Sequence, residues 1–219
     1  SQLRASGVPL CSLETFTPLR EFDVLGFSLQ YEMGFTNMLD MLELGGIPLR
    51  AAERGPADPL VVVGGACAFN PEPVADFIDL AILGDGEDRI NDLADACIAL
   101  KKSPPRTREE ALIFLVKNVP NAYAPALYDV KYGSDGRVES VRPRPGTGAP
   151  ELVQAAMVAD FENAYVPERP IVPFVETVHD RISVEIMRGC TRGCRFCHAG
   201  MTRRPIRCRS IERILAICE

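Results

Sequence analysis

Short apolar runs alternate with amphipathic segments along the first hundred residues of the chain. The runs that predict strands cover residues 8–13, 23–30, 60–65 and 79–84. The run at 60–65 (LVVVGG) is rich in β-branched residues, which is typical of a strand buried in a parallel sheet. Between these runs, the spacing of apolar residues predicts helices over 37–44 and 86–102. Strand–helix alternation at this spacing predicts an α/β fold built on a doubly wound parallel sheet.

The alternation stops at residues 103–105 (SPP), which interrupt the helical periodicity. One more helix is expected over 108–118. Residues 126–132 and 137–142 are expected to form a β-hairpin that turns at 133–136 (GSDG). The sequence therefore predicts a smaller, separate element after the parallel sheet.

The C-terminal part begins with a connector and returns to a strand–helix pattern. Residues 143–173 are rich in proline and glycine, which favours extended and turn conformations. Residues 182–187 (ISVEIM) predict a strand, and residues 210–218 predict a helix with Ser210 as its N-cap. The cysteine-rich segment lies between this strand and this helix.

Composition is ordinary for a globular protein and excludes few functions. The chain is 47% hydrophobic and 25% charged, and its net charge of −6 gives no overall attraction to phosphate backbones. No apolar run reaches the roughly 20 residues that a transmembrane helix needs, and no signal peptide precedes the first strand. We therefore expect a cytoplasmic protein without a membrane segment. Because Ser1 opens in mid-pattern and Glu219 interrupts a helical pattern, we expect a piece of a longer protein.

Five of the eight cysteines crowd into the last thirty residues, and three of them share one loop. Without a secretory signal, these cysteines argue against a disulfide framework. Cys190, Cys194 and Cys197 follow the spacing C-x3-C-x2-C within RGCTRGCRFCHAG. Thiolates are the preferred ligands of iron–sulfur clusters, and three of them can hold three irons of a [4Fe–4S] cluster. The fourth iron then keeps an open position, as reactive metal sites do.

Two other metal sites fit the same cysteines less well. Zinc would take His198 or Cys208 as its fourth ligand, but structural zinc sites usually pair their ligands as C-x2-C on two separate knuckles. A ferredoxin-type electron carrier would need a fourth cysteine and a C-x2-C-x2-C run. Cys208 and Cys218 are expected to be packing thiols.

A strongly basic stretch surrounds the cysteines. Residues 188–213 contain eight arginines, against Glu212 as their one acid. Such a stretch suits nucleic acid, an anionic cofactor or substrate, or a solvated face. A zinc-dependent nucleic-acid-binding module is therefore an alternative function.

The cysteine spacing resembles the signature of the radical S-adenosylmethionine (SAM) superfamily, in which an aromatic residue commonly precedes the third cysteine, as Phe196 does here. The resemblance implies that the open iron binds the amino and carboxylate groups of SAM. An external electron donor of flavodoxin or ferredoxin type would reduce the cluster, which would cleave SAM to a 5′-deoxyadenosyl radical. Phe196 would shield the cluster or lie beside the adenine. The strand and helix around the cysteines would be the first βα unit of a (β/α)6 partial barrel.

The upstream segment resembles the Rossmann-like cobalamin-binding domain of one branch of that superfamily. There the cofactor rests on the carboxyl edge of the parallel sheet. The loops at that edge here cover residues 28–35, 64–70 and 84–87. Glycines in these loops would let a corrin approach the backbone, namely Gly64, Gly65, Gly84 and Gly86. The D-x-H-x-x-G motif that supplies a histidine ligand is absent, since His179 and His198 lie in other contexts, and a Rossmann-like domain without cofactor is the alternative.

Longer segments, such as FSLQYEMGFTNMLDMLELGGIPL and GGACAFNPEP, resemble a family of uncharacterised bacterial radical SAM proteins with an N-terminal cobalamin-binding-like domain. The resemblance implies three parts. Residues 1–105 would be the cobalamin-binding-like domain, truncated at its N-terminus. Residues 106–173 would be a connector, and residues 174–219 the start of a barrel that is truncated at its C-terminus. The resemblance names no substrate.

Overall fold

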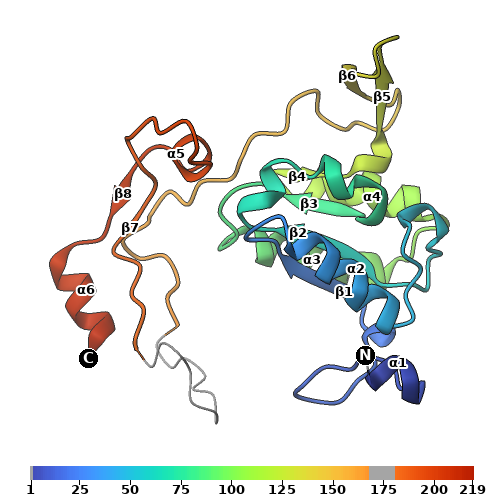
Figure 1. Ribbon diagram of the computed structural model, residues 1–219, viewed down its shortest axis with the longest axis horizontal. Helices are drawn as coiled ribbons and strands as arrows, with labels where there is room; N and C mark the ends of the chain where they lie inside the picture. The colour runs from blue at the N-terminus through green and yellow to red at the C-terminus, as the bar shows by residue number, and fades with distance from the viewer. Residues whose placement is uncertain (1, 168–180) are drawn as a thin grey trace. The chain divides into compact units, whose positions relative to one another are not determined.

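The computed structural model describes residues 2–167 and 181–219, and the chain divides into two compact units (Figure 1). Unit 1 covers Ser1–Ala156 and unit 2 covers Met157–Glu219. Residues 106–156, for which the sequence predicts a connector, contribute one helix and three strands to unit 1.

Unit 1 is built on a four-stranded sheet in the order β1-β2-β3-β4 (Figure 1). Strands β1 (Val24–Ser28), β2 (Leu60–Gly64) and β3 (Leu80–Ile82) run parallel, which confirms three of the predicted strands. Strand β4 (Ala122–Tyr123) pairs antiparallel with β3 and was not predicted. The sheet is therefore mixed, and the prediction of a purely parallel sheet was wrong at this edge.

Helices pack on both faces of this sheet. They are α2 (Gly34–Leu44), α3 (Arg89–Lys102) and α4 (Arg108–Asn118), and all three overlap predicted helices. Short 3-10 turns fill the connections, namely Leu19–Glu21, Ala51–Glu53, Ala66–Phe69, Glu72–Phe77 and Pro125–Leu127. The Thr107 side chain accepts a hydrogen bond from the Glu110 N–H at 3.1 Å and so caps the first turn of α4.

Alternate residues of the central strand separate the two cores. Val61 and Val63 of β2 face the buried Met38 and Leu42 of α2 in one apolar cluster. Val62 belongs to the opposite cluster, whose helical members come from α3 and α4, namely Leu93, Ala96, Leu112 and Leu115. A strand buried on both faces explains the continuous β-branched run in the sequence.

A buried carboxylate, Asp79, ties together the amino ends of β2 and β3. Its Oδ2 accepts a hydrogen bond from the Val61 N–H at 2.8 Å, and the residue is 1% exposed. Arg108 donates from Nε to Oδ1 and from Nη2 to Oδ2, each at 2.8 Å, and Arg54 donates from Nη1 to Oδ2. Burial lowers the pKa of Arg54, while the charge of Asp79 acts in the opposite direction. One acid therefore compensates two guanidinium groups.

The first twenty residues differ from the expected strand. Helix α1 (Gln2–Ser6) opens the chain. The predicted strand at 8–13 is wrong, because this stretch forms a single bridge, between Cys11 and Pro18, and no ladder. An apolar stretch becomes a strand only where a neighbouring strand supplies hydrogen-bond partners along its length.

The predicted hairpin is confirmed as β5 (Tyr128–Tyr132) paired with β6 (Val138–Pro143). Gly136 has a φ of +77° in its turn, a conformation that favours glycine. The Gly133 N–H donates to the Arg137 carbonyl at 2.8 Å and closes the loop.

Unit 2 has a two-stranded antiparallel ribbon of β7 (Met187–Arg188) and β8 (Arg207–Cys208). Helix α5 (Ala199–Thr202) lies between them in the chain, and α6 (Ile211–Cys218) follows. The strand predicted over 182–187 is wrong except at Met187, since its earlier residues have no ladder partner in the described parts of the chain. The first βα unit of a partial barrel therefore stays a prediction.

The N-terminus of α6 is capped as predicted. The Ser210 hydroxyl accepts a hydrogen bond from the Arg213 N–H at 3.1 Å. Glu162 in turn accepts from both the N–H and the hydroxyl of Ser210. These bonds lower the pKa of Glu162, and a carboxylate at a helix N-terminus also interacts favourably with the helix dipole.

Candidate functional site

The carboxyl ends of β1, β2 and β3 meet at one edge of the sheet, because the three strands are parallel. The loops expected to bind a cofactor therefore lie at the same edge. At two of the four predicted glycines, the chain's own backbone occupies the space beside the Cα atom. Gly65 has a φ of +93°, and a Cβ there would lie 2.7 Å from the Leu29 carbonyl oxygen. Gly84 has a φ of +97°, and its Cβ would lie 2.2 Å from the Ala156 carbonyl oxygen.

The backbone of Ala156 packs against Gly84 and forms a parallel bridge with it, just after the end of β3. The Ala156 N–H donates to the Leu83 carbonyl at 2.7 Å, and the Asp85 N–H donates to the Ala156 carbonyl at 2.9 Å. Asn121 holds the same segment through a bond from Nδ2 to the Gln154 carbonyl at 2.9 Å. The last residues of unit 1 therefore lie where the resemblance places a cofactor.

The other two predicted glycines have different surroundings. A Cβ on Gly64 would meet the Ile82 carbonyl oxygen at 3.9 Å, an ordinary contact, and a Cβ on Gly86 would meet nothing within 4 Å. Residues 1–156 also contain no histidine, so this unit supplies no imidazole ligand. The described edge therefore does not fit a corrin resting over Gly65 and Gly84.

Gly84→Ala is expected to lower the free energy of unfolding of the protein by about 2 kcal/mol or more, because the left-handed backbone and the 2.2 Å approach both oppose a methyl group. Gly86→Ala is the matched control, two residues away, and is expected to change it by less than about 0.5 kcal/mol. Urea titrations of both variants measure the difference. Equal stabilities would show that Ala156 does not pack on Gly84 in solution.

The three predicted cluster ligands lie on one loop of unit 2. Cys190 follows β7 after one glycine, and the Cys197 N–H donates to the Cys194 carbonyl at 3.0 Å, which forms a turn between the second and third cysteines. All eight cysteines are free, and none is in a disulfide. The Phe196 ring is 92% exposed.

Close backbone packing fixes the start of this loop. Gly189 has a φ of +97°, and a Cβ there would lie 2.2 Å from the Arg203 carbonyl oxygen and 2.7 Å from that of Pro205. On the far side of the loop, a Cβ on Gly200 would lie 3.0 Å from the Arg192 carbonyl oxygen. The glycines of the motif therefore allow the loop to fold back on the segment that leads to β8.

The donor set of this loop fits a [4Fe–4S] cluster in its chemistry. It supplies three free thiols of partial or full exposure, and thiolates are the ligands that such clusters prefer. Across residues 2–167 and 181–219, no three His, Cys, Asp or Glu side chains are gathered closely enough to hold a metal ion. Cluster binding therefore requires the three thiols to draw together on the loop.

The alternative zinc ligands are positioned on other elements. His198 is the N-cap residue of α5, and Cys208 lies exposed in β8. Cys218 ends α6 and is also exposed, so neither Cys208 nor Cys218 is the packing thiol that the sequence predicts. His179 lies outside the described residues.

Three of the eight arginines serve the fold of unit 2, which the sequence did not reveal. The guanidinium carbons of Arg188, Arg207 and Arg209 lie 5.1, 5.8 and 4.5 Å from the centre of the buried Phe161 ring. Cations at this distance from an aromatic face are attracted to it. Arg209 is itself buried, and its Nη1 donates to the Glu162 carbonyl at 2.8 Å. These arginines therefore do not form a free basic patch.

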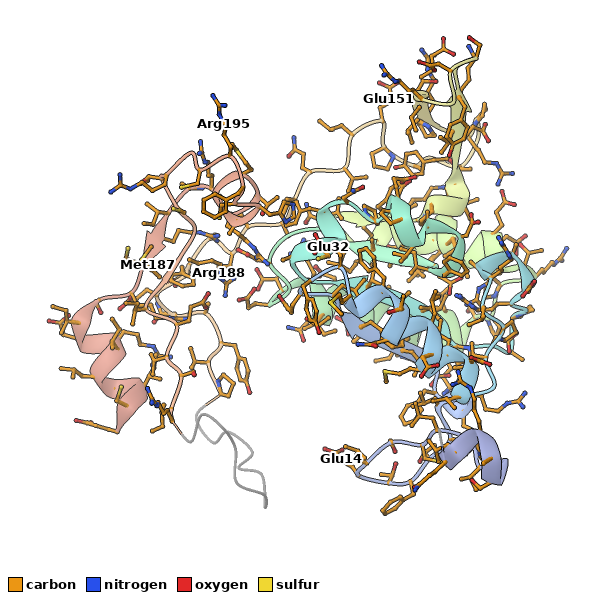
Figure 2. All side chains as sticks on the ribbon, in the orientation of Figure 1. Glu14, Glu32, Glu151, Met187, Arg188 and Arg195 are labelled. Carbon is orange, nitrogen blue, oxygen red and sulfur yellow. The ribbon has the colours of Figure 1, made fainter. Side chains whose placement is uncertain are left out.

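Other arginines near the cysteines are exposed to solvent. Arg192, Arg195 and Arg204 are exposed, and Figure 2 shows the Arg195 side chain projecting outward from the loop. A charged ligand can reach these side chains. The helices of the described residues include none that is long and apolar enough to cross a membrane.

Two comparisons with known proteins bear on this chain, one over most of unit 1 and one over both units. Residues 1–125, more than half of the chain, match the family described as "Radical SAM proteins, N-terminal". The whole chain also aligns over 220 residues, at 23% identity, with an uncharacterized protein of Methanocaldococcus jannaschii. The alignment covers 39% of that relative, so the chain spans about two fifths of its length. The chain belongs to the radical SAM proteins and carries the N-terminal domain of that family.

Proposed function

We propose that the protein is a radical SAM enzyme that binds a [4Fe–4S] cluster through Cys190, Cys194 and Cys197. One observation carries the proposal: the three free thiols share one loop at C-x3-C-x2-C spacing. The family match ends at residue 125, well before this loop. The two lines of support are therefore independent of each other.

Four residues of the loop have roles in this proposal. The three thiolates would each bind one iron and leave the fourth iron for the amino and carboxylate groups of SAM. When bound, such a cluster supplies the electron for reductive cleavage of SAM. The exposed Phe196 ring would cover the cluster or the adenine and keep water away from them, a role for which its present 92% exposure leaves room.

The proposal implies at least one protein partner. An electron donor of flavodoxin or ferredoxin type would reduce the cluster. The exposed side chain of Arg192 supports an anionic substrate, with nucleic acid as one class. Cobalamin assistance has no support from the described edge of unit 1 and is not part of the proposed mechanism.

The test is anaerobic reconstitution of the full-length protein with iron and sulfide, followed by electron paramagnetic resonance of the reduced sample. We expect a [4Fe–4S] signal that changes when SAM is added, because SAM binds the open iron. A cluster signal that SAM leaves unchanged would point to electron transfer instead. Stoichiometric zinc in a colourless protein would contradict the proposal and support the nucleic-acid-binding alternative.

A further inference from the structure

One arginine of the basic stretch is bonded to both flanks of the cysteine loop. Arg204 donates from Nε to the Gly200 carbonyl at 2.5 Å and from Nη2 to the Arg192 carbonyl at 3.1 Å. The two acceptors are eight residues apart in the chain. A single guanidinium group therefore links the backbone carbonyls of residues 192 and 200.

The bridged positions enclose two of the three proposed ligands. Arg192 lies between Cys190 and Cys194, and Gly200 lies three residues beyond Cys197. The Arg192 N–H also lies 3.4 Å from the Cys190 sulfur, so the bridged residue touches the first ligand directly. Fixing the carbonyls of residues 192 and 200 thus limits how far the intervening thiols can move apart.

The two bonds need the shape of an arginine side chain. A guanidinium group presents several N–H donors in a rigid plane, so two of them can reach separate acceptors at once. A lysine ammonium keeps the positive charge but is a compact group on a flexible stem. An Arg204→Lys substitution therefore keeps the positive charge and removes the link between the two carbonyls.

We infer that Arg204 is a positioning residue for the cluster: its guanidinium group, as a clamp, keeps the loop that carries Cys194 and Cys197 closed while the three thiols draw together around iron. This inference rests on the proposed function. Outer-shell groups that orient metal ligands typically change metal affinity by about 10–100-fold when they are removed. The clamp is expected to act on how long the cluster is retained, because it touches the backbone of the loop and not the sulfurs.

The experiment compares Arg204→Ala and Arg204→Lys with Arg195→Ala in the full-length protein. Arg195 is the matched control, because it is an exposed arginine of the same loop for which the structure shows no hydrogen bond or ion pair among the described residues. After anaerobic reconstitution, the release of iron to a chelator is followed by visible absorption. We expect both Arg204 variants to release iron about tenfold faster than wild type, and Arg195→Ala to match wild type.

Hydrogen exchange of the metal-free proteins gives a second readout that does not depend on the cluster. Amides of the peptide covering residues 192–201 are expected to exchange faster in both Arg204 variants, while peptides of unit 1 stay unchanged. Unchanged protection of the α6 amides, which belong to unit 2, also shows that the variants are folded.

The outcomes separate this inference from the proposed function. Wild-type protein that takes up no cluster would overturn both. A stable wild-type cluster with equal iron release from Arg204→Ala and Arg195→Ala would overturn the clamp alone. Full retention in Arg204→Lys with fast release from Arg204→Ala would show that positive charge, and not the bridge, is what matters, and would also overturn it.

Discussion

Cys194→Ser is expected to leave the protein unable to retain a [4Fe–4S] cluster. A serine hydroxyl is a poor substitute for a thiolate, and two thiols cannot hold three irons. The loss of iron affinity should exceed the about 10–100-fold that outer-shell substitutions cost, because a direct ligand is removed. Iron and sulfide analysis after anaerobic reconstitution measures it, and SAM cleavage should disappear with the cluster.

Cys208→Ser is the control for this experiment. Cys208 lies in β8 of the same unit and is also an exposed free thiol, so the two substitutions are chemically matched. It should bind iron as the wild-type protein does. If Cys208→Ser lost its metal as completely as Cys194→Ser, Cys208 would be a ligand, and the zinc site of the alternative function would be favoured over an open cluster.

Asp79→Ala is expected to reduce the free energy of unfolding by about 3–5 kcal/mol, the usual cost of removing one partner from a buried ion pair. The reason is the number of groups that depend on this carboxylate. The side chain of Arg54 is fully buried and that of Arg108 is 12% exposed, and both donate to Asp79, as does the Val61 N–H. Without it, two cations would share a buried space with no acid between them.

A surface pair on the same unit provides the comparison. Asp76 accepts a hydrogen bond from Arg50 at 2.8 Å, but its side chain is 72% exposed. Exposed pairs of this kind contribute about 0–1 kcal/mol, so Asp76→Ala should be nearly neutral. Urea denaturation of both variants gives the two free energies. A similar, small loss in both would mean that water reaches Asp79 and that the buried network does not hold unit 1 together.

The parts of the fold that the sequence predicts correctly are those with local patterns. The valines of β2 are buried on both faces, so their apolar run is continuous and unmistakable. The start of α6 is equally clear, because Ser210 caps the first turn through its own side chain. The cluster ligands stay a prediction, which rests on three cysteines within eight residues, a spacing with few other uses outside disulfide-bonded proteins.

The parts that could not be predicted depend on partners far away in the chain. Strand β4 has two residues, Ala122 and Tyr123, which is too short for any periodicity to appear. Asp79 resembles an ordinary polar residue before a strand until Arg54 and Arg108 are brought to it. Gly84 was expected to leave space for a ligand, but Ala156, which occupies that space, is 72 residues away.

The hydrogen bonds of Ala156 to the end of β3 have a further consequence, for the length of free chain at the junction of the two units. Ala156 is the last residue of unit 1, so its attachment to Leu83 and Asp85 fixes the point where the tether to unit 2 begins. Each residue released from the sheet edge would lengthen that tether by up to about 3.3–3.6 Å. A molecule that competes for the Leu83 carbonyl would therefore loosen the chain at the junction of the two units without touching a cysteine.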